Sequence, residues 1–226
     1  LMRSAQKAGV IYLAPERAIA VEPGATVKVI TDRRVLEAGQ VVVAAGPWAK
    51  DLLDRIGIVL PLAPAVAQVT FLDAPGLVDR PGIAEWSIGD APGFYGHPVP
   101  GIGYKIAFDA GAAGWDPDVQ EWAPDPEEER RALAWLAGRM PSVPPRVYRT
   151  QRHPWTMTPD VDFIVDRQDN LVVAVGCAGH AFKFGPALGR FVADIVQGEQ
   201  APPLTRLGRA ALLNASAPSP SLPISR

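Results

Sequence analysis

The sequence predicts a fold that mixes strands and helices, of the α+β or α/β class. The clearest support is residues 171–175 (LVVAV), a continuous apolar run typical of a buried strand, which leads through a glycine-containing turn into a stretch with apolar residues at helical spacing. Alternating apolar residues nearer the N-terminus favour further strands, and residues 125–128 (DPEE) have the composition of a helix start. Strands and helices are therefore expected along the whole chain.

The first block runs from about residue 9 to residue 58. Its apolar side chains alternate at Val27, Val29, Val41 and Val43. This alternation, interrupted by a turn, predicts a β-meander that closes with the buried strand entering Gly46. Residues 49–56 follow as a short helix with apolar positions on one side.

The second block runs from residue 59 to residue 152 and combines strands with one clear helix. Residues 66–72 and 103–108 are expected to be strands. Asp125 is a good N-cap, Pro126 suits the first helical position, and the acidic residues that follow complement the helix dipole. The helix should end near Arg139.

The third block begins at residue 153 and contains the most informative stretch, residues 176–186 (GCAGHAFKFGP). Such a turn lets backbone approach a ligand and points the N-terminus of the helix starting near Pro186 toward it, although an ordinary tight turn is the alternative. Phe182 and Phe184 flank Lys183, which predicts a partly apolar cavity. From residue 201 to residue 226, Pro, Ser and Ala dominate, and a disordered tail is expected.

Composition excludes several classes of function. The chain has 226 residues and a net charge of −2, which gives no bulk electrostatic reason to expect nucleic acid or an anionic membrane as a partner. No apolar run approaches the length of a membrane span. A single cysteine rules out an intrachain disulfide framework and suits a reducing cytoplasm. The three histidines do not stand at metal-ligand spacing with that cysteine, so no metal site is expected.

Four segments in register resemble the sarcosine oxidase group, FAD-dependent amine oxidases of the D-amino-acid-oxidase superfamily. The glycine turn is similar to the group's C-terminal flavin signature Gly-x-Ser-Gly-His-Gly-Phe-Lys, with Ala178 in place of Ser and Ala181 in place of the third Gly. The other matching segments are residues 41–48 (VVVAAGPW), 95–98 (YGHP) with 103–106 (GYKI), and 158–166 (TPDVDFIVD). The similarity covers residues 9–198.

One family element has no counterpart in this sequence. These flavoenzymes begin with a Gly-x-Gly-x-x-Gly turn that holds the FAD pyrophosphate, and here Gly101-x-Gly103 is the only Gly-x-Gly. We therefore expect the C-terminal part of a two-domain FAD oxidoreductase. Residues 1–58 and 153–200 would form an incomplete FAD-binding domain, interrupted by a mixed-sheet substrate-binding domain at residues 59–152. The N-terminal FAD-binding segment would be a necessary partner.

The resemblance implies roles for three catalytic residues. Lys183 matches the lysine that helps bind the substrate carboxylate, and Lys105 matches the lysine over the flavin that promotes reduction of oxygen. Tyr95 matches the tyrosine on the substrate side of the flavin. From the residues alone, both lysines could instead be solvent-exposed, with the Lys183 stem packed on Phe182, and Tyr95 could be an interior tyrosine.

The resemblance also implies a set of flavin neighbours. The two glycines of the turn would let backbone approach the ring, and His180 would order the loop by hydrogen bonding rather than act as a base. The expected cofactor-binding residues are Gly46, Trp48, Gly176, Cys177, Gly179, His180 and Lys183.

Three departures from the family pattern bear on the cofactor and the substrate. His153 stands where several members carry a cysteine bonded to the flavin, and the only thiol, Cys177, is interpreted as a small buried residue, although either could carry the flavin. Asp109 occupies the position of the family's active-site histidine. We expect non-covalent FAD and a substrate that need not be sarcosine.

The predicted function is oxidation of the C–N bond of a secondary amine or amino acid by an FAD-dependent oxidase. Oxygen would be the electron acceptor and hydrogen peroxide a product. Two alternatives remain open: a flavin dehydrogenase with another acceptor, and a truncated, non-catalytic fragment that does not bind FAD alone.

Overall fold

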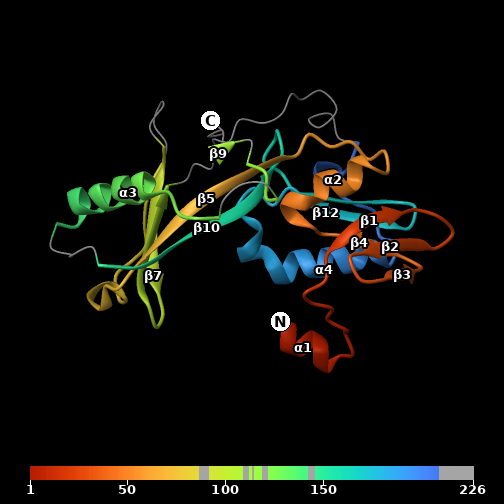
Figure 1. Cartoon of the computed structure of the whole chain (residues 1–226), viewed down its shortest axis with the longest axis horizontal. Coiled ribbons are helices and arrows are strands. Elements are labelled where there is room, and N and C mark those ends of the chain that lie inside the picture. Colours follow the sequence, from red (N-terminus) through yellow and green to blue (C-terminus); the bar gives the residue numbers. More distant parts are fainter. Residues whose placement is uncertain (87–91, 109–111, 114, 119–121, 142–145, 209–226) are drawn as a thin grey trace.

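The computed structural model describes residues 1–86, 92–108, 112–113, 115–118, 122–141 and 146–208. Figure 1 shows helix α3 and strand β7 on one side of the molecule and a group of shorter strands on the other. The long strands β5 (Ala63–Leu72) and β10 (Val147–Met157) run between the two sides. The mixed class of fold predicted from the sequence is confirmed.

The N-terminal part begins with helix α1 (Met2–Lys7) and continues as an antiparallel meander. Its three strands are β1 (Ala18–Glu22), β2 (Val27–Thr31) and β3 (Val35–Ala38). The prediction that Val41 and Val43 belong to this meander is wrong. They lie in β4 (Val41–Val43), which pairs in parallel with β12 of another sheet, and Val43 is buried there. Val42, which points to the opposite face of this strand, is 40% exposed.

A 3-10 turn, η1 (Gly46–Trp48), and helix α2 (Ala49–Asp54) follow β4. The helix is two residues shorter than predicted. It ends because Gly57, with φ +79°, reverses the chain, and its N–H donates to the carbonyl of Asp54 at 3.1 Å.

The central sheet has the strand order β10-β5-β8-β7-β6, and all of these pairs are antiparallel. Besides the two long strands it contains β6 (Ile83–Glu85), β7 (Phe94–Val99), β8 (Gly103–Phe108) and the short β9 (Ala112–Ala113), which pairs with β5. The 3-10 turn η2 (Pro75–Leu77) follows β5. The predicted strand 103–108 is confirmed, and the strand predicted at 66–72 begins three residues earlier.

Helix α3 (Pro126–Arg139) packs on one face of the central sheet, which we call the covered face. The Asp125 side chain accepts a hydrogen bond from the N–H of Glu127 at 2.9 Å, as its predicted role of N-cap requires. The interface buries Leu136 of the helix against Phe94, Tyr104 and other apolar side chains of the sheet. The helix predicted to end near Arg139 is confirmed.

The third sheet has the order β11-β12-β4, from β11 (Ile164–Gln168) and β12 (Leu171–Val175). Helix α4 (Gly185–Val196) packs on it, burying Ile195 against Val165 and Val172. It begins one residue before Pro186, after the 3-10 turn η3 (Ala181–Phe184). The predicted strand and the helix after it are confirmed.

The stretch after α4 packs on the third sheet instead of forming a loose tail up to residue 208. Ala201 is buried, the 3-10 turn η4 (Pro203–Thr205) follows, and the N–H of Leu207 donates to Asp166 Oδ2 at 2.8 Å. Residues 209–226, the rest of the predicted tail, lie outside the described residues. Within the described part of the chain, no helix has the length and apolar character to cross a membrane.

Candidate functional site

The side of the central sheet opposite α3, which we call the open face, carries several of the predicted site residues. In an antiparallel pair, residues directly opposite each other point to the same face, and every second residue along a strand does so too. Phe71 on β5 lies opposite Lys105 on β8 and opposite Arg149 on β10. The register and alternation place the following side chains on this face: Phe71, Tyr95, His97, Lys105, Arg149, Gln151, His153 and Trp155.

Tyr95 and Lys105, two of the predicted catalytic residues, are neighbours on the open face. Lys105 Nζ lies 5.8 Å from the centroid of the Tyr95 ring, which suits a cation–π contact. Burial lowers the pKa of Lys105 below its ordinary value, because the ammonium loses part of its hydration. The pKa of His153 is also lowered, by burial first and then by the positive charges of Lys105 and Arg149.

The glycine turn rests on the end of β10. The N–H of Ala178 donates to the carbonyl of Thr156 at 2.9 Å, which anchors the turn to that strand. A Cβ at Gly176 (φ +72°) would lie 2.5 Å from Thr158 Cγ2, and one at Gly179 (φ +75°) would lie 3.2 Å from the Trp155 ring. Packing and the positive φ both require glycine at residue 176, whereas at residue 179 the positive φ is the main reason and the contact is only tight.

Trp155 links the turn to the open face and was missed by the sequence analysis. Its ring packs beside Gly179, while its strand position places it on the same face as His153. The indole Nε1 is buried, and no hydrogen-bond partner for it occurs among the described residues. A buried donor without a partner costs about 1–3 kcal/mol, so this N–H is a candidate donor to a bound group.

Among the described residues, the two phenylalanines beside Lys183 do not enclose it in the predicted cavity. Phe182 is 99% exposed and Phe184 is 46% exposed. Lys183 is exposed, and its Nζ lies 5.4 Å from the centroid of the Phe184 ring. The small Ala178 occupies the buried position of the turn, and η3 places both phenylalanine rings outside that core. The role of Lys183 toward a substrate carboxylate stays a prediction.

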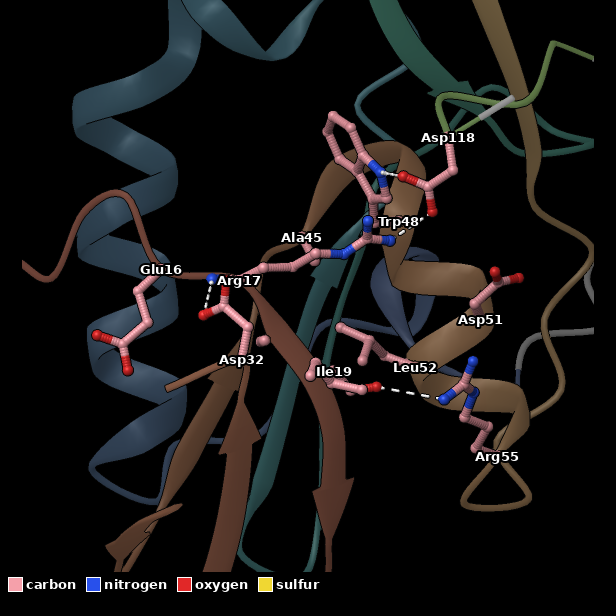
Figure 2. A pocket seen from close by; sticks show the side chains of 11 residues that line it. Glu16, Arg17, Ile19, Asp32, Ala45, Trp48, Asp51, Leu52, Arg55 and Asp118 are labelled. Carbon is pink, nitrogen blue, oxygen red and sulfur yellow. Dashed lines mark hydrogen bonds and ion pairs between the residues drawn. The ribbon is translucent and has the colours of Figure 1, made fainter. Parts of the chain in front are cut away.

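Trp48, a predicted cofactor-binding residue, lines a cavity between the start of β1, α2 and the loop at Asp118 (Figure 2). Its volume is about 670 Å³, and Trp48 forms part of its wall. Trp48 Nε1 donates to Asp118 Oδ1 at 2.9 Å, and the Arg17 guanidinium pairs with the same carboxylate. The hydrogen bond from Arg17, followed by that from Trp48, lowers the pKa of Asp118. Arg17 and Asp118 are 101 residues apart, so no local pattern could have predicted their contact.

Gly46 differs from the glycines of the turn. Its φ is +52°, and a Cβ there would meet nothing within 4 Å, so its backbone borders open space. The turn η1 that contains it packs against both β5 and β10. The open face, the glycine turn and η1 are thus brought together along β10.

Two further predicted cofactor residues lie within the glycine turn itself. Cys177 is partly exposed and is a free thiol, and the N–H of His180 donates to the carbonyl of Cys177 at 2.8 Å. Asp109, predicted near the substrate, lies outside the described residues. Within the ranges that the structure describes, no group of His, Cys, Asp or Glu could hold a metal ion.

The chain is similar in structure to part of a solved amino acid oxidase. The chain aligns with NikD, an unusual amino acid oxidase essential for nikkomycin biosynthesis, with a TM-score of 0.76 and 27% identity, covering 87% of this chain and 55% of that one. The family model for DAO, FAD dependent oxidoreductase, matches residues 1–195. The chain therefore belongs to the DAO family of FAD-dependent oxidoreductases.

The curated relatives are distant, and each match covers only part of the relative. Human peroxisomal sarcosine oxidase is 28% identical over 198 residues, which is 80% of this chain and 49% of the relative. The monomeric sarcosine oxidase of Bacillus sp. strain B-0618 is 28% identical over 75% of this chain and 46% of the relative. N-methyl-L-tryptophan oxidase of Escherichia coli O81 is also 28% identical, over 74% of this chain and 45% of the relative. The chain spans about half the length of these relatives.

The family implies FAD, and the residues present fit that cofactor. The Trp155 N–H, which has no partner among the described residues, supplies a hydrogen-bond donor, and Gly46 leaves its backbone accessible. The open face adds an aromatic ring and a half-buried cation at Tyr95 and Lys105. These are groups that a planar, polar-edged ring system could contact.

Proposed function

We propose that this chain forms the substrate side of an FAD-dependent oxidase that oxidises the C–N bond of a secondary amine or amino acid. The observation that carries the proposal is the pairing of Tyr95 with the half-buried Lys105 on the open face, within a chain of the DAO family. When bound, FAD accepts two electrons from the amine and passes them to oxygen, which gives hydrogen peroxide.

In this proposal Lys105 stabilises the negative charge that develops as oxygen is reduced. A fixed cation in a partly desolvated site is worth more than the same charge in water. Lys105 is effective only while protonated. Because burial lowers its pKa, the oxygen reaction should weaken with rising pH earlier than for an ordinary lysine. Tyr95 borders the substrate and holds the lysine through its ring.

The remaining assignments follow the family resemblance. Lys183 binds the carboxylate of an amino-acid substrate, and the residues that contact the flavin are Gly46, Trp48, Gly176, Cys177, Gly179 and His180. Trp155 joins this set because its buried N–H needs an acceptor. FAD is held without a covalent bond.

FAD affinity also needs a dinucleotide-binding segment, because no Gly-x-Gly-x-x-Gly turn occurs in these 226 residues. In this assignment residues 1–58 and 153–200 complete the FAD-binding domain and residues 59–152 form the substrate-binding domain. Below, "reconstructed holoenzyme" denotes this chain joined to such a segment and loaded with FAD.

The proposed reaction predicts that sarcosine or another N-methyl amino acid reduces the reconstructed holoenzyme without oxygen. In air it should form one peroxide per amine oxidised. Absorbance of the flavin and a coupled peroxidase assay measure the two steps. Turnover with an artificial electron acceptor but not with oxygen would instead identify a dehydrogenase. Failure of every amine tested to reduce the flavin would contradict the proposal.

The second prediction concerns attachment of the cofactor. Acid precipitation of the reconstructed holoenzyme should release all the flavin into the supernatant, because no cysteine stands at residue 153. Flavin fluorescence of the supernatant and of the denatured pellet measures the two fractions. Fluorescence that stays with the pellet would contradict this expectation. The variants His153→Ala and Cys177→Ala would then identify the residue that carries the flavin.

A further inference from the structure

The open face carries positive charge without a matching negative charge in the part of the chain that the structure describes. Lys105 and Arg149 carry this charge, and the other open-face residues, His153 included, are aromatic or neutral. The charges of Lys105 and Arg149 both lower the pKa of His153, so the three groups share one electrostatic environment. Such a surface favours an anionic ligand.

None of the ion pairs shown in the described residues includes Arg149. Carboxylates pair with Arg17, Arg34, Arg130, Arg139, Arg146 and Arg190. The Arg149 guanidinium instead lies 4.6 Å from the centroid of the Phe71 ring and 5.8 Å from that of Tyr148. Contact with a ring occupies the guanidinium's face and leaves its N–H edge for a planar anion.

The position of Arg149 relative to Lys105 limits what that anion can be. The two residues lie on either side of Phe71, on strands that flank β5. Neighbouring strands are spaced about 4.8 Å apart, so the two backbones are separated by about 10 Å. Both side chains are long and rise from the same face. A substrate that extends from Lys105 across β5 would therefore bring its distal end near Arg149.

We propose that Arg149 is a specificity-determining residue that binds a second carboxylate, in the side chain of an acidic amino-acid substrate. The inference rests on the proposed function and deepens it by naming the substrate class: N-methylated dicarboxylic amino acids. The bidentate fork of arginine matches a carboxylate, and its contact with Phe71 orients it before the ligand arrives.

Binding of two substrate fragments that cannot be oxidised tests the proposal independently of turnover. Isothermal titration calorimetry of the reconstructed holoenzyme with succinate and with propionate measures how much the second carboxylate adds to binding affinity. Succinate should bind more tightly, and Arg149→Gln should lower the ratio of succinate to propionate affinity about 10- to 100-fold. Arg149→Lys should restore part of that ratio, because it keeps the charge but not the fork.

Arg152→Gln is the matched control. It removes the same charge from the same strand, but Arg152 alternates onto the covered face. Equal affinity of the unaltered enzyme for both probes, an unchanged ratio in Arg149→Gln, or the same fall in Arg152→Gln would overturn the proposal.

Turnover distinguishes failure of this inference from failure of the proposed function. The unaltered enzyme should favour N-methyl-L-aspartate over sarcosine in kcat/KM, and Arg149→Gln should reduce that preference. If succinate binding depends on Arg149 but neither amine is oxidised, the result supports the anion site and contradicts the proposed oxidase activity. If both amines are oxidised with no preference that depends on Arg149, the result supports the oxidase activity and contradicts the anion site.

Discussion

The Lys105→Met variant of the reconstructed holoenzyme should react with oxygen about 100-fold more slowly after reduction by an amine. Removing one group that stabilises developing charge typically costs 10²–10³ in rate, and Lys105 is the half-buried cation beside Tyr95. Methionine keeps most of the side-chain bulk. Reduction by the amine should remain close to normal. Stopped-flow measurement of the two half-reactions in separate mixing experiments separates these effects.

Lys183→Met is the matched comparison for that experiment, because the two lysines are assigned to different half-reactions. Its affinity for an amino-acid substrate should fall, while its reaction with oxygen should be normal. The exposure of Lys183 in this chain predicts a smaller loss than for a buried ion pair. A second check uses pH: the oxygen reaction of the unaltered enzyme should fall as Lys105 loses its proton, and this dependence should vanish in Lys105→Met. An unchanged oxygen rate in Lys105→Met would remove its assigned role.

The Gly176→Ala variant should lose about 2–5 kcal/mol of unfolding free energy. Alanine at φ +72° is strained, and its Cβ would lie 2.5 Å from Thr158 Cγ2. Thr158 is fully buried, and its hydroxyl donates to the carbonyl of Asp162 at 2.9 Å, so it cannot turn away without breaking that bond. Urea denaturation of the chain followed by tryptophan fluorescence measures the loss.

Substitutions at two other glycines separate backbone strain from the steric contact with Thr158 as causes of that loss. At Gly46, φ is +52° but a Cβ meets nothing, so Gly46→Ala should show the backbone strain alone, about 1–2 kcal/mol. Gly189 lies within α4 in open space, and Gly189→Ala should stabilise the helix by up to about 1 kcal/mol. A loss at Gly176 no greater than that at Gly46 would show that Thr158 moves aside at little cost.

Local sequence signals predicted several elements correctly. Asp125 and Pro126 predicted the start of α3, since capping depends on residues within one turn of the helix. The apolar run of β12 and the helical spacing of α4 were equally clear, because a strand or helix repeats its pattern over consecutive residues. The motifs that resemble the sarcosine oxidase group led to the correct family.

Errors arose where pairing or burial depends on residues far along the chain. The three valines of β4 were assigned to the wrong sheet, because their partner β12 lies about 130 residues away and a strand does not specify its neighbour. The cavity around Lys183 was inferred from adjacent phenylalanines, yet Phe182 is almost fully exposed and Phe184 packs against Phe163 instead of enclosing the lysine.

By itself the sequence determined the family, the principal strands and helices, and Tyr95 and Lys105 as separate candidate residues, because each of these depends on short motifs or local periodicity. Only the tertiary structure showed that Arg149 shares a face with Lys105, that Trp155 buries a donor beside the glycine turn, and that Asp118 contacts Trp48. These relations depend on strand register and on contacts between distant segments. Register is established when the sheet buries one of its faces, so it is a property of the packed molecule and not of any single stretch of chain.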